Sequence, residues 1–132
     1  MARKDLEYSE VERGSETLVY RLSGNLYGTD AGYAFQEAVR RAASADTKRF
    51  VIDLSGVDRI DSCGIGILAA SIFSVQKAGG GMVLAALPEH IQRMLGLTMF
   101  LDHVAHAETV DDALAKVAGM ELSGGTTSAP TE

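Results

Sequence analysis

An aspartate, a serine and a cysteine stand side by side in the middle of the sequence, directly before a glycine-rich stretch. In "RFVIDLSGVDRIDSCGIGILAAS" (residues 49–71), Asp61, Ser62 and Cys63 separate an apolar run that favours a buried strand from a long apolar segment that favours a helix. Ser62 or Asp61 at this junction is suited to cap the helix, because the first N–H groups of a helix lack partners within it. The same position also suits a catalytic serine or a thiol of lowered pKa.

Sequence patterns of known enzymes fit this stretch poorly. Gly64, Gly66 and Ala69 satisfy G-x-G-x-x-A, but nine residues separate them from the preceding apolar run, and no acidic residue follows at the distance needed to hold a ribose. A nucleophile elbow needs a glycine where the chain has Ile60, and the lysine of a P-loop is missing. No histidine lies near Cys63 in the sequence, so we expect a half-buried cysteine. The sequence therefore predicts no enzyme and no cofactor.

Two further groups of residues have a structural interpretation and a functional one. His103 and His106 have the spacing H-x-x-H, but no third ligand belongs to the pattern, so we expect surface or half-buried histidines and no metal site. An apolar cluster around residues 88–100 favours core packing over an exposed docking patch, although methionine-rich surfaces can bind partners. Its members are Met94, Leu95, Leu97, Met99 and Phe100.

The composition is that of one soluble globular domain. The chain has 132 residues and a mass of 14.0 kDa, with 46% hydrophobic and 23% charged residues, which excludes disorder throughout. A net charge of −6 argues against nucleic-acid binding, since phosphate neutralisation needs clustered basic residues. No apolar run reaches the ~18 residues of a membrane span, and the first residues do not resemble a signal peptide. A single cysteine allows no internal disulfide, so the expected location is the cytoplasm.

Apolar periodicity and turn residues predict alternating strands and helices, which favour an α/β sheet. Turns are expected at Gly14-Ser15 and Gly79-Gly80-Gly81, a break at Ser23–Asn25, and a loop over residues 55–64. Thr29 or Asp30 is the expected cap of the first helix, and Thr109 with Asp112 resembles a capping box. Strands are expected over residues 6–12, 17–22, 50–54, 82–87 and 104–107, and helices over 29–43, 65–78, 88–96 and 110–118.

The combination of motifs resembles the STAS domain of bacterial anti-sigma-factor antagonists. The resemblance rests on a strand ending in Asp53-Leu54, the motif "DSCGIG", a helix, a Gly-Gly turn into a strand, and "LGL". The earlier "SGNL" matches a G-x-L turn, so the resemblance covers about Leu18 to Ala118. It implies a single STAS domain over residues 1–119, with a mixed sheet of four to five strands and about four helices, and a disordered tail over 120–132. A monomer is the default of the family.

The resemblance also implies a function. In such antagonists the serine of the motif, here Ser62, is phosphorylated by an anti-sigma factor that is also a serine kinase. The unphosphorylated antagonist binds the anti-sigma factor and releases the sigma factor, phosphorylation breaks that complex, and a serine phosphatase resets it. The implied partner-binding residues are Asp58, Asp61, Ser62, Cys63, Gly64 and Gly66.

The sequence departs from the family pattern at two places. Cys63 replaces a common hydroxyl residue. Tyr27 stands where many members have an acidic residue, and the first acidic residue of this sequence after that point is Asp30. These departures keep a second function open, that of a STAS scaffold or accessory subunit in a stress-signalling or lipid-transport assembly. In that case Ser62 is mainly a helix cap, and a stoichiometric complex would be insensitive to its substitution.

Overall fold

The structure, a computed structural model, is a mixed five-stranded sheet with helices on both faces. It describes residues 5–13, 16–45, 47–97 and 100–120. The strands lie in sequence order, and only the first pair, β1 with β2, is antiparallel. The strands are β1 (Glu7–Glu12), β2 (Thr17–Leu26), β3 (Arg49–Ile60), β4 (Gly81–Ala85) and β5 (Ala105–Ala107), and the helices are α1 (Asp30–Ser44), α2 (Ser62–Lys77), α3 (Glu89–Leu97), the 3-10 turn η1 (Phe100–His103) and α4 (Val110–Ala118). The α/β class predicted from the sequence is confirmed.

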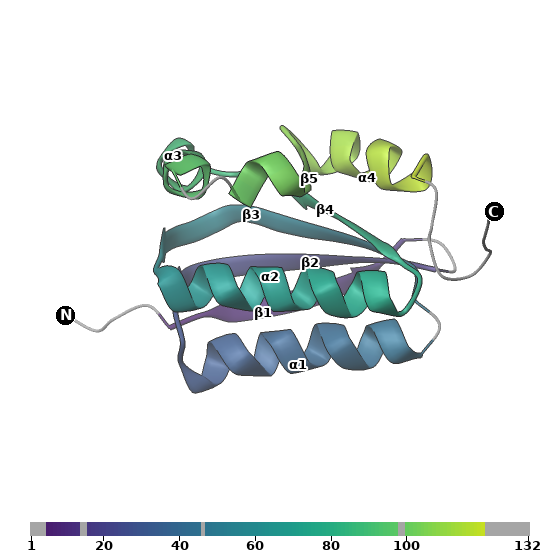
Figure 1. The fold of residues 1–132 in the computed structure, drawn as a ribbon, viewed down its shortest axis with the longest axis horizontal. Helices are drawn as coiled ribbons and strands as arrows, with labels where there is room; N and C mark the ends of the chain where they lie inside the picture. Colours follow the sequence, from purple (N-terminus) through teal and green to yellow (C-terminus); the bar gives the residue numbers. More distant parts are fainter. Residues whose placement is uncertain (1–4, 14–15, 46, 98–99, 121–132) are drawn as a thin grey trace.

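Alternating side chains along the central strands build two cores. Phe50 and Ile52 of β3 belong to the larger core, to which α1, α2, α3 and η1 contribute, whereas Val51 points to the smaller core under α4. A parallel strand covered on both faces is apolar at successive positions, as this one is. Figure 1 shows α1 and α2 lying side by side, with their N-termini at the same end of the molecule as α3.

Two sequence predictions about β2 and β3 are wrong, and the error has a physical cause. The expected break at Ser23–Asn25 lies within β2, and the expected loop after Leu54 is largely the second half of β3. The two strands stay paired to Leu26 and Ile60 through two register shifts. Gly24 has a φ of 91°, a left-handed conformation that suits glycine, so the irregular pairing continues and Val57 and Ile60 become buried.

The helices begin and end at the expected kinds of residue. Thr29 caps α1, where its hydroxyl accepts a hydrogen bond from the Gly32 N–H, and the Thr109 hydroxyl accepts one from the Asp112 N–H at 3.0 Å. Gly79, after α2, has a φ of 89°, as expected for a left-handed turn. α2 starts at Ser62 rather than Ile65, because its cap lies three residues earlier than the apolar pattern indicates.

The apolar cluster around α3 is only partly core. Leu95 is buried, but Met94 is 41% exposed and Leu97 is 85% exposed, so the prediction of core packing is wrong for these two residues. They lie on the side of an amphipathic helix that does not face the sheet. The predicted turn at Gly14-Ser15, Met99 of the cluster, and residues 121–132 of the predicted tail lie outside the described residues; Met120 packs against the smaller core.

Tyr20 gives the fold a pH dependence that can be measured. Its ring is buried among Tyr8, Phe35 and Phe50, and its hydroxyl has no hydrogen-bond partner of good geometry in the described part of the chain. Burial raises the pKa of Tyr20 well above its usual range, and the nearby Glu10 carboxylate adds to this shift. The unfolded chain then loses a proton above about pH 10 that the folded chain keeps.

We therefore expect the free energy of unfolding to fall as the pH rises above about 10. Urea unfolding at several pH values, for the wild type and for Tyr20→Phe, measures this effect. Tyr20→Phe should show a shallower fall, because its ring carries no ionisable group. An equally steep fall in both proteins would show that other groups cause the alkaline loss.

Candidate functional site

Asp61 caps α2, so the hydroxyl of Ser62 is not the group that caps the helix. Oδ1 of Asp61 accepts a hydrogen bond from the Gly64 N–H at 2.8 Å, and its backbone is extended, with φ −115° and ψ −175°. The structure thus resolves the choice between Asp61 and Ser62 as the cap. Ser62 is the first residue of the helix and is exposed, and within the described part of the chain its hydroxyl takes part in no hydrogen bond.

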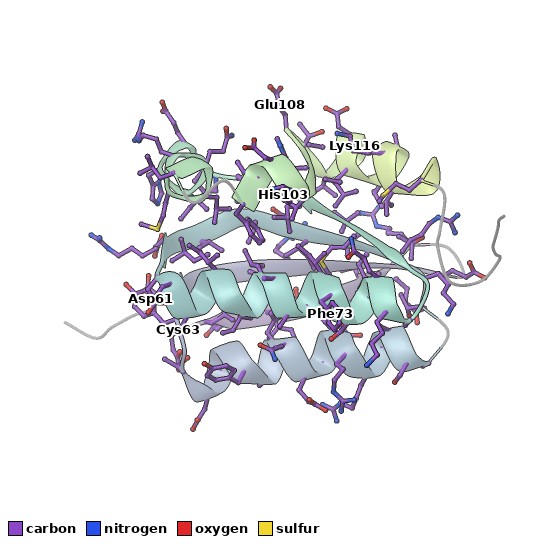
Figure 2. The ribbon with its side chains drawn as sticks, in the orientation of Figure 1. Asp61, Cys63, Phe73, His103, Glu108 and Lys116 are labelled. Atoms are coloured by element: carbon purple, nitrogen blue, oxygen red, sulfur yellow. The ribbon has the colours of Figure 1, made fainter. Side chains whose placement is uncertain are left out.

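Cys63 is exposed, contrary to the half-buried state expected from the sequence. It is the second residue of α2, and its side chain faces the loop between β2 and α1. A Cβ placed on Gly28 would lie 2.8 Å from Cβ of Cys63 and 3.3 Å from the Tyr33 hydroxyl. The loop can approach the start of α2 this closely because position 28 has no side chain. Figure 2 shows Asp61 and Cys63 together at that end of the helix.

The two glycines of the motif have different roles. A Cβ on Gly64 would overlap the carbonyl oxygen of Leu26 and lie 2.8 Å from Cγ1 of Ile60, so this glycine allows α2 to begin directly against the ends of β2 and β3. A Cβ on Gly66 would meet no heavy atom within 4 Å. Close approach of α2 to the sheet therefore needs a glycine at position 64 but not at position 66, which is exposed.

Asp58 lies on the same rim but on a strand rather than in a loop. It lies in β3 at the second register shift between β2 and β3, and its backbone carbonyl is 2.5 Å from Nε2 of His90 at the start of α3. Asn25, Arg59 and His90 line an open depression with Asp58. The sequence analysis did not select His90, because its contact with Asp58 joins residues 32 positions apart and no local sequence pattern indicates it.

Five of the six residues expected to bind a partner are exposed where β3 ends and α2 begins, and these five are called the rim. Asp58, Asp61, Ser62, Cys63 and Gly66 are exposed, whereas Gly64 is buried beneath them and sets the position of the helix. The rim combines acidic groups, a hydroxyl and the positive end of the α2 dipole. Tyr33, 50% exposed and next to Cys63, adds an aromatic ring that the sequence analysis did not select.

The two histidines of the H-x-x-H pattern lie in different elements. His103 lies in η1 and His106 in β5, and both are exposed. Among the described residues, no three His, Cys, Asp or Glu side chains are grouped so that they could hold a metal ion. Within the same residues, no helix has the length and apolar character needed to cross a membrane.

Comparisons with known proteins agree with this geometry. Residues 8–113 match the STAS domain family. A Thermotoga neapolitana protein, named as a candidate anti-sigma factor antagonist, is 31% identical over 71 residues; the match covers 54% of this chain and 63% of that protein, so the chain spans less than two thirds of its relative.

Solved structures show the same fold. An anti-sigma factor antagonist from Mycobacterium paratuberculosis is 26% identical, with a TM-score of 0.74 over 89% of this chain and 97% of that one. SpoIIAA, another anti-sigma factor antagonist, is 17% identical; its unphosphorylated form has a TM-score of 0.73 over 86% of this chain and 98% of that one. Its phosphorylated form has a TM-score of 0.67, over 84% of this chain and 99% of that one. The chain belongs to the STAS domain family.

Proposed function

We propose that this protein is an anti-sigma-factor antagonist, switched by phosphorylation of Ser62. The unmodified chain binds an anti-sigma factor that is also a serine kinase, through the rim of Asp58, Asp61, Ser62, Cys63 and Gly66, and so releases a sigma factor. Phosphorylation of Ser62 by that kinase ends the complex, and a serine phosphatase restores it. The protein acts as a monomer in the cytoplasm and performs no catalysis itself.

The observation that carries this proposal is that Asp61, and not Ser62, caps α2. Because Asp61 caps α2, the Ser62 hydroxyl is exposed and uncommitted, so a kinase can modify it without removing a bond that holds the helix. In a serine that was itself the cap, phosphorylation would modify the oxygen that accepts that bond.

The fold can accept a phosphate at this position. A phosphoserine carries about −1.5 to −2 charges at neutral pH, and the first turn of a helix offers unpaired N–H groups and the positive end of the dipole. A partner surface that fits a neutral hydroxyl cannot accept the same group without desolvating it. The rim already contains the carboxylates of Asp58 and Asp61, which adds repulsion toward an acidic partner surface.

Phosphorylation of Ser62 is the first expected result. Wild type, Ser62→Ala and Ser74→Ala are incubated with ATP and an extract of the source cells, and intact mass and peptide mapping are recorded. We expect one phosphate on the wild type and on Ser74→Ala, located at Ser62, and none on Ser62→Ala. Ser74 lies on the same helix, so it controls for nonspecific serine modification.

Absence of phosphate contradicts the proposal if an unrelated kinase substrate is modified in the same extract. Ser62 would then be an ordinary exposed helix residue, and a scaffold or accessory role in a larger assembly would describe the chain better. A phosphate at another serine would equally contradict the assignment of the site.

A further inference from the structure

Phe73 is an exposed aromatic residue near the end of α2. Its surface is 63% exposed, whereas Ile67, Leu68 and Val75 of the same helix are buried. Figure 2 shows Phe73 well separated along α2 from Asp61 and Cys63, and His103 on η1, above α2 in this view. Exposed apolar side chains that border a concave surface often mark interaction sites.

One side of Phe73 borders an apolar groove between α2 and the segment that contains η1. The groove has a volume of about 330 Å³. Its α2 wall spans Ile65 to Gln76, about 16 Å of helix at 1.5 Å per residue, and its other wall is formed by Phe100, His103 and Val104. This length matches three turns of a helix laid against it. Apolar grooves of this kind bind the apolar face of amphipathic helices.

The other side of Phe73 borders a basic depression of similar volume, about 330 Å³, between α1 and α2. Arg40 and Lys77 line it together with the hydroxyl residues Ser44 and Ser74, and no carboxylate among the described residues lines either hollow. The Lys77 ammonium lies 6.0 Å from the centre of the Phe73 ring.

The charge of this surface is positive on an acidic protein. Lys48 does not line the basic depression, but its ammonium donates a hydrogen bond to the carbonyl of Ala78, which does line it, at 3.1 Å. Glu37 pairs with Arg40 on α1 and neutralises part of the charge, so Lys77 and Lys48 carry most of the excess. The whole chain has a net charge of −6, which makes a local basic surface an exception that favours acidic partners.

We propose that the groove and the basic depression form a second docking surface, which binds an acidic amphipathic helix of another protein. The apolar stripe of that helix covers Phe73 and fills the groove toward Phe100, and its Asp or Glu side chains face Lys77 and Arg40. Phe73 lies 11 residues after Ser62, about 16 Å along α2, so Phe73 and the basic depression are separate from the rim, whereas the far end of the groove reaches the rim at Ile65. The proposal does not depend on the function proposed for the rim.

A display library of helices tests this proposal. Each helix of about 16 residues has leucines at positions i, i+3, i+4 and i+7, and the flanking positions are randomised among Glu, Lys and Gln. Selection on the folded wild-type protein should enrich Glu at the flanks. The affinity of the selected peptides, measured by fluorescence anisotropy, should fall at least 10-fold when Glu is replaced by Lys, and it should weaken with added salt.

Three variants of the protein locate the binding surface. Phe73→Ala should weaken binding at least 10-fold, Lys77→Glu should reverse the preference between Glu and Lys peptides, and Leu97→Ala should change nothing. Leu97 is 85% exposed on α3, so its substitution removes a similar exposed side chain from another surface. Failure to select any peptide, selection without Glu enrichment, or equal losses in Phe73→Ala and Leu97→Ala would overturn the proposal. Self-association of the protein that Phe73→Ala abolishes would also overturn it, because the occupant would then be a second copy.

Discussion

The chain phosphorylated at Ser62 is expected to bind its anti-sigma factor about 100- to 1000-fold more weakly than the unmodified chain. Ser62 stands at the exposed start of α2, between Asp61 and Cys63, so any partner that covers the rim must enclose its side chain. Enclosing a phosphate in a surface formed for a hydroxyl costs about 3–4 kcal/mol, which corresponds to this change in affinity. A loss of this size is sufficient to exchange partners.

Titration calorimetry measures the effect with the anti-sigma factor isolated on wild-type bait. Ser62→Ala should stay within a few-fold of the wild type, and Ser62→Asp should lose at least 10-fold. Ser9→Asp is the matched control, since it adds the same charge on β1, far from the start of α2. Equal losses for Ser62→Asp and Ser9→Asp would mean that overall charge, not the rim, determines binding.

Gly64→Ala should lower the free energy of unfolding by about 2–3 kcal/mol. The added methyl group would overlap the Leu26 carbonyl oxygen, which is backbone and cannot rotate away, and would press against Ile60. Overpacking of this kind costs more than the ~1 kcal/mol gained when alanine replaces glycine within a helix. Denaturation in urea measures the difference.

Gly66→Ala is the control on the same turn of α2. Position 66 has open space around the added methyl group, so helix propensity alone determines the change in stability. The free energy of unfolding should rise by about 0.5–1 kcal/mol. If both substitutions stabilise the protein equally, α2 does not begin against the ends of β2 and β3 as described.

The elements that local chemistry determines were predictable from the sequence. The caps at Thr29 and Thr109 and the left-handed turn at Gly79 depend on side chains within a few residues, so their patterns identify them. The alternation of strands and helices likewise predicted the class of the fold. Ser62 was correctly expected at the start of a helix.

The features that were missed depend on contacts between distant residues. The second half of β3 looks like a loop because Ser55, Gly56 and Asp58 are poor strand formers, yet the strand continues through them because Gly56, Val57 and Arg59 pair with β2. Phe73 lies in an apolar run, so the sequence does not reveal its exposure, which depends on where α1 and η1 pack. The hydrogen bond between His90 and Asp58 is similarly invisible to local patterns.

One phosphate on Ser62 is expected to decide whether the partner binds. The most direct measurement mixes equal amounts of phosphorylated and unmodified protein with a limiting amount of the anti-sigma factor, without ATP, and records the complexes by native mass spectrometry. We expect the complex to contain almost only the unmodified chain. A complex that contains both forms equally would contradict the switch and leave the STAS fold as a scaffold.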